Sequence, residues 1–442
     1  MTFQDFKLSN QILNALDELG YSKATTIQQK VFPIALSGKD LCGIAQTGTG
    51  KTLSYLLPSI HQWKYNKAKS IQILILVPTR ELVTQVVKNI EEIAKYTNLT
   101  AIGVYGGANI NTQHLELQNG ADILVATPGR LFDLAMKGSF KIKNIKKLII
   151  DEVDEMLNFG FRTQLQNIME LMPERRQNMM FSATMIPEVE ELIALYFNNP
   201  VYVEAAPTGT PLENISQQAF RVPNFNTKVN FIKSLLADKN TFEKVLIFVG
   251  TKRMADSLYE ELFPLFEGEF GVIHSNKEQN HRFNTVKEFE NGNYRFIIAT
   301  DIVARGIDIA EVSHVINFDT PEVPENYIHR IGRTGRAEKK GISITFFTPK
   351  EEKFLEAIEA LMSFKIPSFE LPESIEVSTI LIEDEKPKVF MKLPPLPPLK
   401  REDAGPAFHE KSAKNSKKNI VVRHKDKMLL KYGKPKKRGK KK

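Results

Sequence analysis

The sequence predicts an α/β protein with two tandem domains, each built on a parallel sheet, joined by a short linker and followed by a disordered basic C-terminal tail. Three observations predict this organisation. The chain has 442 residues, which is more than one hydrophobic core usually holds. Short apolar runs alternate with longer amphipathic ones, which is typical of α/β folds. The apolar runs are continuous, and this indicates strands buried on both faces of a parallel sheet.

The predicted elements fall into two sets. Strand-like runs lie at 71–77, 100–105, 123–126, 147–150 and 177–181, and again at 245–249, 270–274, 296–299, 312–317 and 343–347. Amphipathic stretches at 80–96, 252–265 and 278–291 predict helices between them. The segment 204–214 carries two prolines and a glycine, so it separates the sets as a loop. We predict a first domain over 1–206, a linker over 207–213, a second domain over 214–365 and a spacer with a tail over 366–442.

The last part of the chain has a different composition. Residues 393–399 read Leu-Pro-Pro-Leu-Pro-Pro-Leu, which favours a stiff polyproline spacer, with a ligand for a proline-recognition domain as the alternative. From Lys400 onward there are 17 Lys and Arg against 4 Asp and Glu, which gives this part a net charge of +13. Because the whole chain carries only +8, residues 1–399 must be mildly acidic. The asymmetry predicts a disordered arm for a polyanion, most simply nucleic acid. A solubilising or localisation tail is the alternative.

Composition also excludes several classes of protein. No run approaches 18 consecutive apolar residues, so no membrane span is predicted, and no secretory signal is visible at the N-terminus. Cys42 is the single cysteine, which excludes an intramolecular disulfide and a Cys-rich zinc site. We interpret Cys42 as a small buried strand residue rather than a reactive thiol, in a reducing compartment.

Residues 45–52, Ala-Gln-Thr-Gly-Thr-Gly-Lys-Thr, predict a polyphosphate site. The glycines let backbone N–H groups converge on phosphate oxygens, and the following helix directs its positive end at them. Lys51 would reach the β- and γ-phosphates, and the Thr52 hydroxyl would hold Mg²⁺. Because short motifs recur by chance, this stretch needs support from elsewhere, and by itself it leaves ATP and GTP open.

A second segment supplies carboxylates. The apolar run 148–150 ends in Asp151-Glu152-Val153-Asp154, and parallel sheets present such strand ends at their ligand-binding edge. Asp151 suits Mg²⁺ coordination, and Glu152 suits orienting or deprotonating an attacking water. A solvated acidic helix start would be the alternative without the upstream lysine. Hydroxyls of the later Ser182-Ala183-Thr184 could bond these carboxylates, or serve only as a helix cap.

A third segment supplies cations. Residues 329–336 read His-Arg-Ile-Gly-Arg-Thr-Gly-Arg, with three arginines at a spacing of three. Such charges repel one another, so the pattern predicts a clamp for an anion rather than a stabilising feature. Arginines placed on a γ-phosphate raise the rate of phosphoryl transfer by about 10³–10⁵. A basic phosphate-contacting patch with no catalytic role is the alternative.

In their order along the chain, these motifs resemble those of the DEAD-box RNA helicases of helicase superfamily 2, over residues 1 to about 365. The set comprises Phe3 with 20–28, then 45–52, 78–82, 106–107, 127–130, 151–154, 182–184, 246–249, Gln279 with Arg282, 299–308 and 329–336. The early start resembles compact bacterial members, in particular the RhlE-like branch, and implies a cytoplasmic protein. The resemblance implies two RecA-like domains, ATP with Mg²⁺, and RNA-stimulated ATP hydrolysis by a monomer. Closure of the domains would locally unwind short RNA duplexes or remodel RNA–protein complexes.

The resemblance also assigns roles to residues. On the nucleotide, Gln28 would read the adenine edge, Phe3 would stack on its ring and Asp308 would bond the ribose. The phosphates would be held by Gln46, Thr47, Gly48, Thr49, Gly50, Lys51 and Thr52, and the catalytic set would be Lys51, Asp151 and Glu152 with Arg333 and Arg336 as arginine fingers. The RNA backbone would be held by Thr79, Arg80, Gly107, Thr127, Gly129 and Arg130, and by Thr251, Gln279, Arg282, Thr300 and Arg305. Backbone contacts imply largely sequence-independent binding, and the 2′-hydroxyl favours RNA over DNA.

The sequence departs from the family pattern at three positions. Val153 stands where alanine is usual, which predicts adjusted packing against 182–184, and Ala24 and Thr26 stand where prolines are usual, which predicts a looser adenine loop. None of these changes removes a reacting group. Two rival functions remain at this stage: a DNA-unwinding translocase of the same superfamily, and a non-catalytic RNA clamp or annealing factor in which Val153 marks lost hydrolysis.

Overall fold

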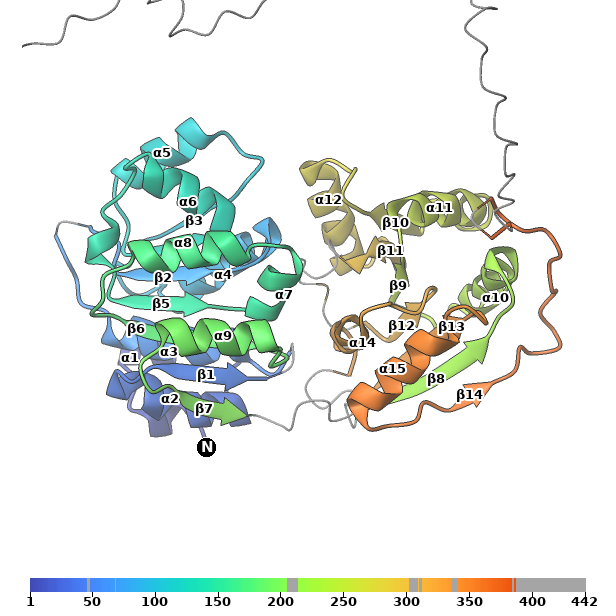
Figure 1. Cartoon of the computed structure of the whole chain (residues 1–442), viewed down its shortest axis with the longest axis horizontal. Helices are drawn as coiled ribbons and strands as arrows, with labels where there is room; N and C mark the ends of the chain where they lie inside the picture. Colours follow the sequence, from blue (N-terminus) through green and yellow to red (C-terminus); the bar gives the residue numbers. More distant parts are fainter. Residues whose placement is uncertain are drawn as a thin grey trace, which may run out of the picture. The chain divides into compact units, whose positions relative to one another are not determined.

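The computed structural model describes residues 1–45, 48–67, 69–204, 214–301, 309, 312–335, 340–383 and 385–386. Residues 1–385 form one compact unit that contains two seven-stranded sheets (Figure 1). Every strand pair in both sheets is parallel. The predicted fold class, two tandem parallel-sheet domains, is therefore confirmed.

The first sheet is buried on both faces. Along β2, Ile73 and Ile75 belong to one hydrophobic cluster, and Leu74 and Leu76 belong to the cluster on the opposite face. Since successive strand side chains point to opposite faces, a fully apolar strand fits only the middle of a covered sheet. Its strands are β1 (Leu41–Ile44), β2 (Ile73–Leu76), β3 (Ala101–Val104), β4 (Ile123–Ala126), β5 (Lys147–Ile150), β6 (Gln177–Ser182) and β7 (Val201–Glu204), in the order β3-β4-β2-β5-β6-β1-β7.

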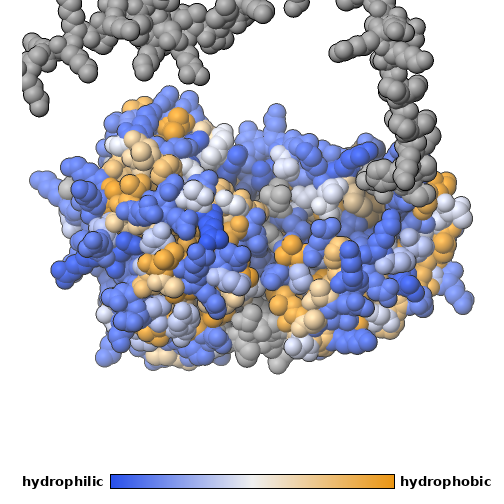
Figure 2. Space-filling view, viewed as in Figure 1, coloured by the Kyte–Doolittle hydropathy of each residue, from blue (hydrophilic) through white to orange (hydrophobic). Residues whose placement is uncertain are grey.

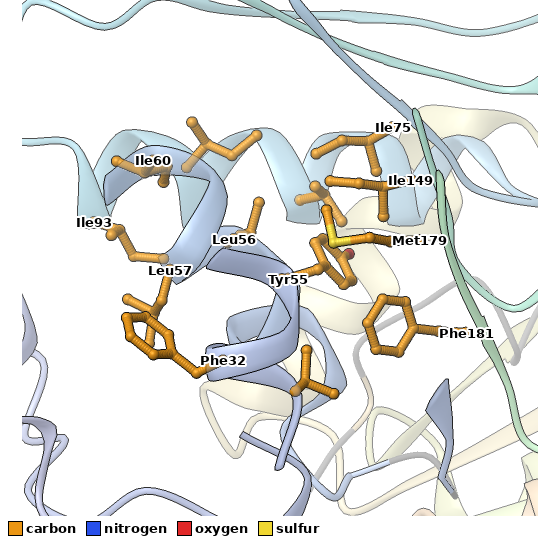
Figure 3. Packing of buried hydrophobic residues seen from close by; sticks show 14 of the residues in the cluster. Phe32, Tyr55, Leu56, Leu57, Ile60, Ile75, Ile93, Ile149, Met179 and Phe181 are labelled. Atoms are coloured by element: carbon orange, nitrogen blue, oxygen red, sulfur yellow. The ribbon is translucent and has the colours of Figure 1, made fainter. Parts of the chain in front are cut away.

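Helices cover each face of this sheet. One cluster takes its helical side chains from η1 (Phe3–Phe6), α1 (Asn10–Glu18), α2 (Thr26–Ser37), α3 (Lys51–Gln62) and α4 (Arg80–Ile93). Figure 3 shows Tyr55 of α3 beside Met179 and Phe181 of the sheet, and Ile60 of the same helix near Ile93 of α4. The other cluster receives side chains from α5 (Ile110–Gln118), α6 (Pro128–Met136), α7 (Val153–Asn158), α8 (Arg162–Leu171) and α9 (Pro187–Tyr196), and η2 spans Ile142–Asn144.

The second sheet repeats this plan. Its strands are β8 (Ile215–Arg221), β9 (Val245–Val249), β10 (Phe270–Ile273), β11 (Phe296–Thr300), β12 (His314–Asn317), β13 (Gly341–Phe347) and β14 (Ser368–Phe369), in the order β10-β11-β9-β12-β13-β8-β14. Its helices are α10 (Phe225–Ala237), α11 (Lys252–Phe266), α12 (Gln279–Glu290), α14 (Pro324–Ile331) and α15 (Glu352–Met362). All ten predicted strand runs correspond to strands of the two sheets, with ends that differ by a few residues.

Four strands lie outside the ten predicted runs, namely β1, β7, β8 and β14. For β1, the interpretation of Cys42 as a buried strand residue is confirmed. The longest of the four, β8, reads Ile-Ser-Gln-Gln-Ala-Phe-Arg. Its outer neighbour is the two-residue β14, and its residues alternate between buried and more exposed positions. A strand near the edge needs apolar side chains at only alternate positions, so it leaves no continuous apolar run in the sequence.

The second domain extends beyond the predicted boundary at residue 365. Three asparagines of the α10 region donate Nδ2 hydrogen bonds to carbonyl oxygens of a later extended segment: Asn224 to Ser378 (2.6 Å), Asn226 to Ile380 (2.8 Å) and Asn230 to Glu376 (3.0 Å). Leu371, Ile375 and Ile382 of that segment pack on a hydrophobic cluster of the domain. The predicted linker over 207–213 and the predicted tail from 387 onward lie outside the described residues.

The distribution of hydrophobic residues on the surface is consistent with most of them being buried in the cores. On the face shown in Figure 2, hydrophobic residues form separate areas among hydrophilic ones. Among the described residues, no helix is both long and apolar enough to cross a membrane.

Candidate active site

The predicted motifs of the first domain meet at one edge of its sheet. Ala45 and residues 48–50 follow β1, Pro78-Thr79 follow β2, Thr127 follows β4, Asp151 follows β5 and Ala183-Thr184 follow β6. Because all these strands are parallel, their carboxyl ends lie at the same edge, which is where α/β sheets bind ligands. Motifs separated by up to 140 residues in the sequence are thereby brought into one place.

A cavity of about 350 Å³ opens at this edge, a size typical of small-molecule sites. It contains residues from both predicted halves of the site. The predicted residues that line it are Phe3, Gln28, Gly48, Gly50, Lys51, Thr52, Asp151 and Glu152 from the first domain and Arg333 from the second. Thr49 is described but is not among the lining residues, and the predicted Gln46, Thr47, Asp308 and Arg336 lie outside the described residues.

Lys51 is the first residue of α3, and its side chain enters the cavity. The residue is 6% exposed, and its Nζ has no hydrogen-bond partner in the described part of the chain. A buried ammonium group without an acceptor is unfavourable unless an anion occupies the space beside it. The helix N-terminus also favours negative charge at this point, so the cavity fits a polyphosphate.

The residues predicted to bind adenine lie at the start of α2, where Thr25 and Gln28 form a capping box. Thr25 N donates to Gln28 Oε1 (2.9 Å), and Gln28 Nε2 donates to the Gly50 carbonyl (3.2 Å). Gly50 has φ +90°, and a Cβ there would lie 2.5 Å from Gln28 Nε2, so only glycine fits. A hydrogen bond from Ala24 N to the Met1 carbonyl (3.1 Å) also ties this segment to the N-terminus, and the looser adenine loop stays a prediction.

The two central carboxylates lie deep in the site. Asp151 accepts hydrogen bonds on both oxygens, from the Tyr55 hydroxyl on Oδ2 (2.9 Å) and from Glu152 N on Oδ1 (3.0 Å). Burial raises the pKa of Asp151, and the positive charge of Lys51 opposes this shift. Glu152 has the left-handed backbone conformation, φ 54°, a strained geometry that is often found at functional positions. Burial raises the pKa of Glu152 to about 7, against the opposing effect of Lys51.

Glu152→Gln should stabilise the free protein, and more so at pH 8 than at pH 5. The folded-state pKa of Glu152 lies above its unfolded value, so ionisation costs stability progressively as the pH rises toward 7, and the cost is constant above that. Glutamine carries no such cost. We expect a rise in Tm of about 2–4 °C at pH 8 and a smaller one at pH 5, measured by thermal unfolding without nucleotide. An equal shift at both pH values would contradict the assigned burial effect.

Asp154 connects this strand end with residues 182–184. Its Oδ2 accepts from Ala183 N (3.1 Å), Thr184 N (2.9 Å) and the Thr184 hydroxyl (2.9 Å). Burial alone would raise the pKa of Asp154, but the positive charges of His329 and Lys51 and the bonds from Thr184 hold this pKa below its ordinary value. The predicted bond from a hydroxyl to a carboxylate is therefore present for Thr184. Ser182 differs, because its hydroxyl donates to the Thr184 carbonyl (2.6 Å).

The three arginines of 329–336 do not act as one clamp. Arg330 is 2% exposed and donates two hydrogen bonds to Asp301, from Nε to Oδ1 (2.6 Å) and from Nη2 to Oδ2 (2.8 Å). A further bond joins Arg330 Nη1 to the Asp319 carbonyl (2.7 Å). The prediction that all three charges gather on an anion is therefore wrong for Arg330, which stabilises its own domain. Arg333 lines the nucleotide cavity instead.

A second cavity, of about 450 Å³, adjoins two helix N-termini. Thr79 is the N-cap of α4, with its hydroxyl accepting from Leu82 N (3.4 Å), and Thr127 is the N-cap of α6. Both helices thus direct the positive end of their dipole at this cavity, as helices at phosphate-binding sites do. Of the predicted RNA contacts, Thr79, Arg80, Thr127, Gly129, Arg130 and Arg282 line it.

The other predicted RNA contacts are arranged differently. Gly107 has φ +83° and lies so close to the Arg80 guanidinium that any side chain there would collide with it. Thr251 caps α11, with its hydroxyl accepting from Met254 N (3.2 Å), and Thr300 lines a neighbouring cavity with Gly250. Arg305 lies outside the described residues.

Gln279 and Arg282 contact Glu81 of the first domain. Gln279 Nε2 donates to Glu81 Oε1 (2.9 Å), and Arg282 forms an ion pair with the same oxygen. Glu81 is 5% exposed. A second contact between the domains joins the Glu155 carboxylate and the His329 ring. Gln279 and Arg282 were predicted to contact RNA, and in this structure both contact the Glu81 carboxylate instead. Their RNA role stays a prediction.

Sequence reasoning missed Glu81, Glu155 and Tyr55 as members of the site. Glu81 and Glu155 stand within the quoted motifs or beside them, but their partners lie about two hundred residues later, so no local pattern could indicate the pairing. Tyr55 had a detectable signal. It follows Lys51 by four residues on α3, which places both side chains on the same face of the helix.

The arrangement defines a class of protein. A Gly-rich loop with a lysine at a helix start, a strand-end Asp-Glu pair and an arginine from a second parallel-sheet domain together describe a nucleoside triphosphatase with two RecA-like domains. Residues 25–192 match the DEAD/DEAH box helicase family, and residues 227–338 match the helicase conserved C-terminal domain. The chain belongs to the DEAD-box ATP-dependent RNA helicases, enzymes that hydrolyse ATP.

Relatives and solved structures agree with this family. The chain is 39% identical to the ATP-dependent RNA helicase DbpA of Bacillus subtilis, over 90% of this chain and 82% of that protein. It is 37% identical to the DEAD-box helicase CshA of the same organism, over 84% and 74%. Yeast (S. cerevisiae) Dbp5 bound to RNA and ADP BeF3 superposes with a TM-score of 0.76 at 28% identity, over 84% of this chain and 95% of that one. Mss116p bound to single-stranded RNA and AMP-PNP gives 0.77 at 26% identity, over 85% and 80%. These matches do not test the RhlE-like branch, which stays a prediction.

Proposed function

We propose that ATP and RNA close the two sheet domains of this helicase against each other, and that hydrolysis opens them again. Closure would bend one bound RNA strand, so that a few base pairs of a short duplex separate without long translocation. The observation that carries this proposal is that Lys51, Asp151 and Glu152 of one domain line the same cavity as Arg333 of the other. Because one chain supplies both halves, the proposed active unit is a monomer.

The chemistry is assigned to residues of the cavity. Lys51 neutralises the β- and γ-phosphates, Glu152 orients and deprotonates the attacking water, and Arg333 stabilises charge on the transferred phosphoryl group. Thr52 and Asp151 would hold Mg²⁺, because the buried Asp151 carboxylate and a hydroxyl are oxygen donors of the kind this ion prefers. When bound, Mg²⁺ would offset the negative charge of the phosphates.

RNA is proposed to bind along the second cavity and its neighbour. The helix N-termini at Thr79 and Thr127 suit phosphate groups, and Arg80 adds positive charge. Such contacts reach the backbone rather than the bases, so binding should depend little on sequence. The RNA-bound Dbp5 and Mss116p structures, which superpose on this chain, support this assignment.

Two polar contacts between the domains support a coupling between nucleotide and RNA. Glu81, beside the RNA cavity, contacts Gln279 and Arg282, while Glu155, three residues after Glu152, contacts His329. Both carboxylates are buried, so these two contacts between the domains are shielded from water. Closure around one ligand would therefore complete the binding surface for the other.

The experiment that tests the proposal measures phosphate release and strand separation on the same preparation. Phosphate release is followed alone, with single-stranded RNA and with duplex DNA, and displacement is followed on a short and a long RNA duplex. We expect RNA-specific stimulation and efficient separation of the short duplex only. Stimulation by duplex DNA, or processive separation of the long duplex, would overturn the mechanism. Annealing without hydrolysis would indicate the clamp function.

Lys51→Ala should weaken ATP binding by about 100-fold, because a charged hydrogen-bond donor to the phosphates is lost. Equilibrium binding of a fluorescent ATP analogue would measure the effect. Lys64→Ala, at an exposed position just after α3, is the control. Unchanged affinity in Lys51→Ala would refute the phosphate role.

We further propose that the basic tail is an auxiliary RNA arm. Truncation after residue 400 would remove most of a segment with net charge +13. The RNA concentration for half-maximal ATPase activity should rise about tenfold at low salt and change less at high salt, because fewer counterions are released on binding. Turnover at saturating RNA should hardly change. An unchanged RNA requirement at low salt would remove this role.

A further inference from the structure

Tyr55 packs its ring in the hydrophobic core and places its hydroxyl at the proposed nucleotide site. The residue is fully buried, and its ring lies 5.2 Å from the ring of Phe181 within the first core cluster. Figure 3 shows this ring among apolar side chains of α3 and the sheet. Its hydroxyl donates to Asp151 Oδ2 at 2.9 Å. Packing alone needs only the ring, so the hydroxyl calls for a separate explanation.

The second residue assigned to the cation lies on the same helix. Thr52 stands three residues before Tyr55 on α3, so the two side chains lie on the same face of the helix. The Tyr55 hydroxyl therefore ties the helix that carries Thr52 to Asp151 at the end of β5. The other oxygen of Asp151 accepts from Glu152 N at 3.0 Å. Both carboxylate oxygens thus have fixed donors, and the orientation of the group is determined before any ligand binds.

We propose that Tyr55 is a positioning residue that holds Asp151 in place, beside the helix that carries Thr52, for the divalent cation that accompanies the nucleotide. This inference rests on the proposed function, since it takes those two residues as the cation's protein contacts. Residues that hydrogen-bond to metal ligands orient them, and their loss usually lowers metal affinity by about 10–100-fold. Without the hydroxyl, one oxygen of a buried carboxylate loses its donor, and the link between helix and strand is broken.

Tyr55→Phe tests the inference, because it keeps the ring and its packing and removes only the hydroxyl. Binding of fluorescent ADP is titrated with Mg²⁺ at equilibrium, and repeated in EDTA, so that no turnover is involved. We expect the Mg²⁺ concentration for half-maximal binding to rise about tenfold. Affinity in EDTA should stay within about twofold of the parent, because the phosphate-binding lysine and loop are untouched.

Tyr327→Phe is the matched control. This tyrosine is also fully buried, but its hydroxyl donates to Gln217 Oε1 (3.0 Å) in the second domain. Its removal should leave the Mg²⁺ requirement unchanged. An equal change in both variants, or an equal loss of affinity with and without Mg²⁺ in Tyr55→Phe, would overturn the positioning role in favour of a general loss of structure.

The possible failures are distinguishable. If Mg²⁺ strengthens ADP binding to the parent and to Tyr55→Phe at the same concentration, this inference is rejected and the assignment of the cation to Thr52 and Asp151 stands. If Mg²⁺ does not strengthen nucleotide binding to the parent at all, the cation assignment itself fails, and the inference fails with it.

Discussion

Glu152→Gln is expected to stop RNA-stimulated ATP turnover while leaving ATP binding intact. Glutamine fills the same volume but cannot accept a proton from the attacking water, and the loss of a general base usually costs about 10²–10⁴ in rate. Glu152 lines the nucleotide cavity beside Asp151, and burial brings its pKa to about 7, where a carboxylate is a more effective base. Phosphate release at saturating ATP and RNA measures the effect.

ATP affinity is the companion measurement. It should be unchanged or improved in Glu152→Gln, because one negative charge near the phosphates is removed. Glu170→Gln, at an exposed position of α8, controls for a general effect of losing a carboxylate. Turnover within a factor of about three of the parent in Glu152→Gln would show that another group activates the water.

Arg333→Ala is expected to lower ATP turnover by about 10³ or more, with a much smaller effect on folding. Arg333 is 4% exposed and lines the nucleotide cavity, and its positive charge lowers the pKa of Glu152. The charge therefore reaches the site from the second domain, as an arginine finger requires. Lysine should not restore the rate, because it lacks the planar two-pronged geometry of guanidinium.

Arg330→Ala provides the contrast, three residues earlier in the same motif. It would remove the two hydrogen bonds that Arg330 donates to the Asp301 carboxylate, and breaking a buried ion pair costs about 3 kcal/mol or more. The second domain should therefore unfold at a lower temperature in this variant, whereas Arg333→Ala should keep nearly the parent Tm. The reverse pattern, with a folded but inactive Arg330→Ala and an unstable but active Arg333→Ala, would exchange the assigned roles.

Local sequence patterns predicted those parts of the candidate site in which the functional groups stand next to one another in the chain. The Gly-rich loop before Lys51 and the Asp151-Glu152 pair after an apolar strand are short segments in which backbone geometry and reacting groups occur together. The apolar runs predicted both sheets for the same reason, because a strand covered on both faces must be apolar along its whole length. Where one face is more exposed, as in β8, the run disappears and the strand was not predicted.

The three similar arginines show where such reasoning ends. Arg330 and Arg333 share one motif, one charge and one spacing, and only the position of Asp301 on another element separates their roles. Glu81 with Arg282, and Tyr55 with Asp151, are likewise pairs whose members are far apart in the chain. No periodicity connects such residues, since their distance is decided by strand order and helix packing.

By itself, the sequence determined the chemical class of this protein: an ATP-hydrolysing helicase with two parallel-sheet domains, whose predicted reacting groups lie in short contiguous motifs. Only the tertiary structure decided that Arg333 lines the cavity with Lys51 while Arg330 bonds to Asp301, that the buried Tyr55 hydroxyl contacts Asp151, and where the second domain ends. The physical reason is that the hydrogen bonds and charges a side chain can offer are fixed by its residue type and are therefore known from the sequence. Which residues contact one another depends on distances in space, and these are set only when the sheets form and bring their strand ends together.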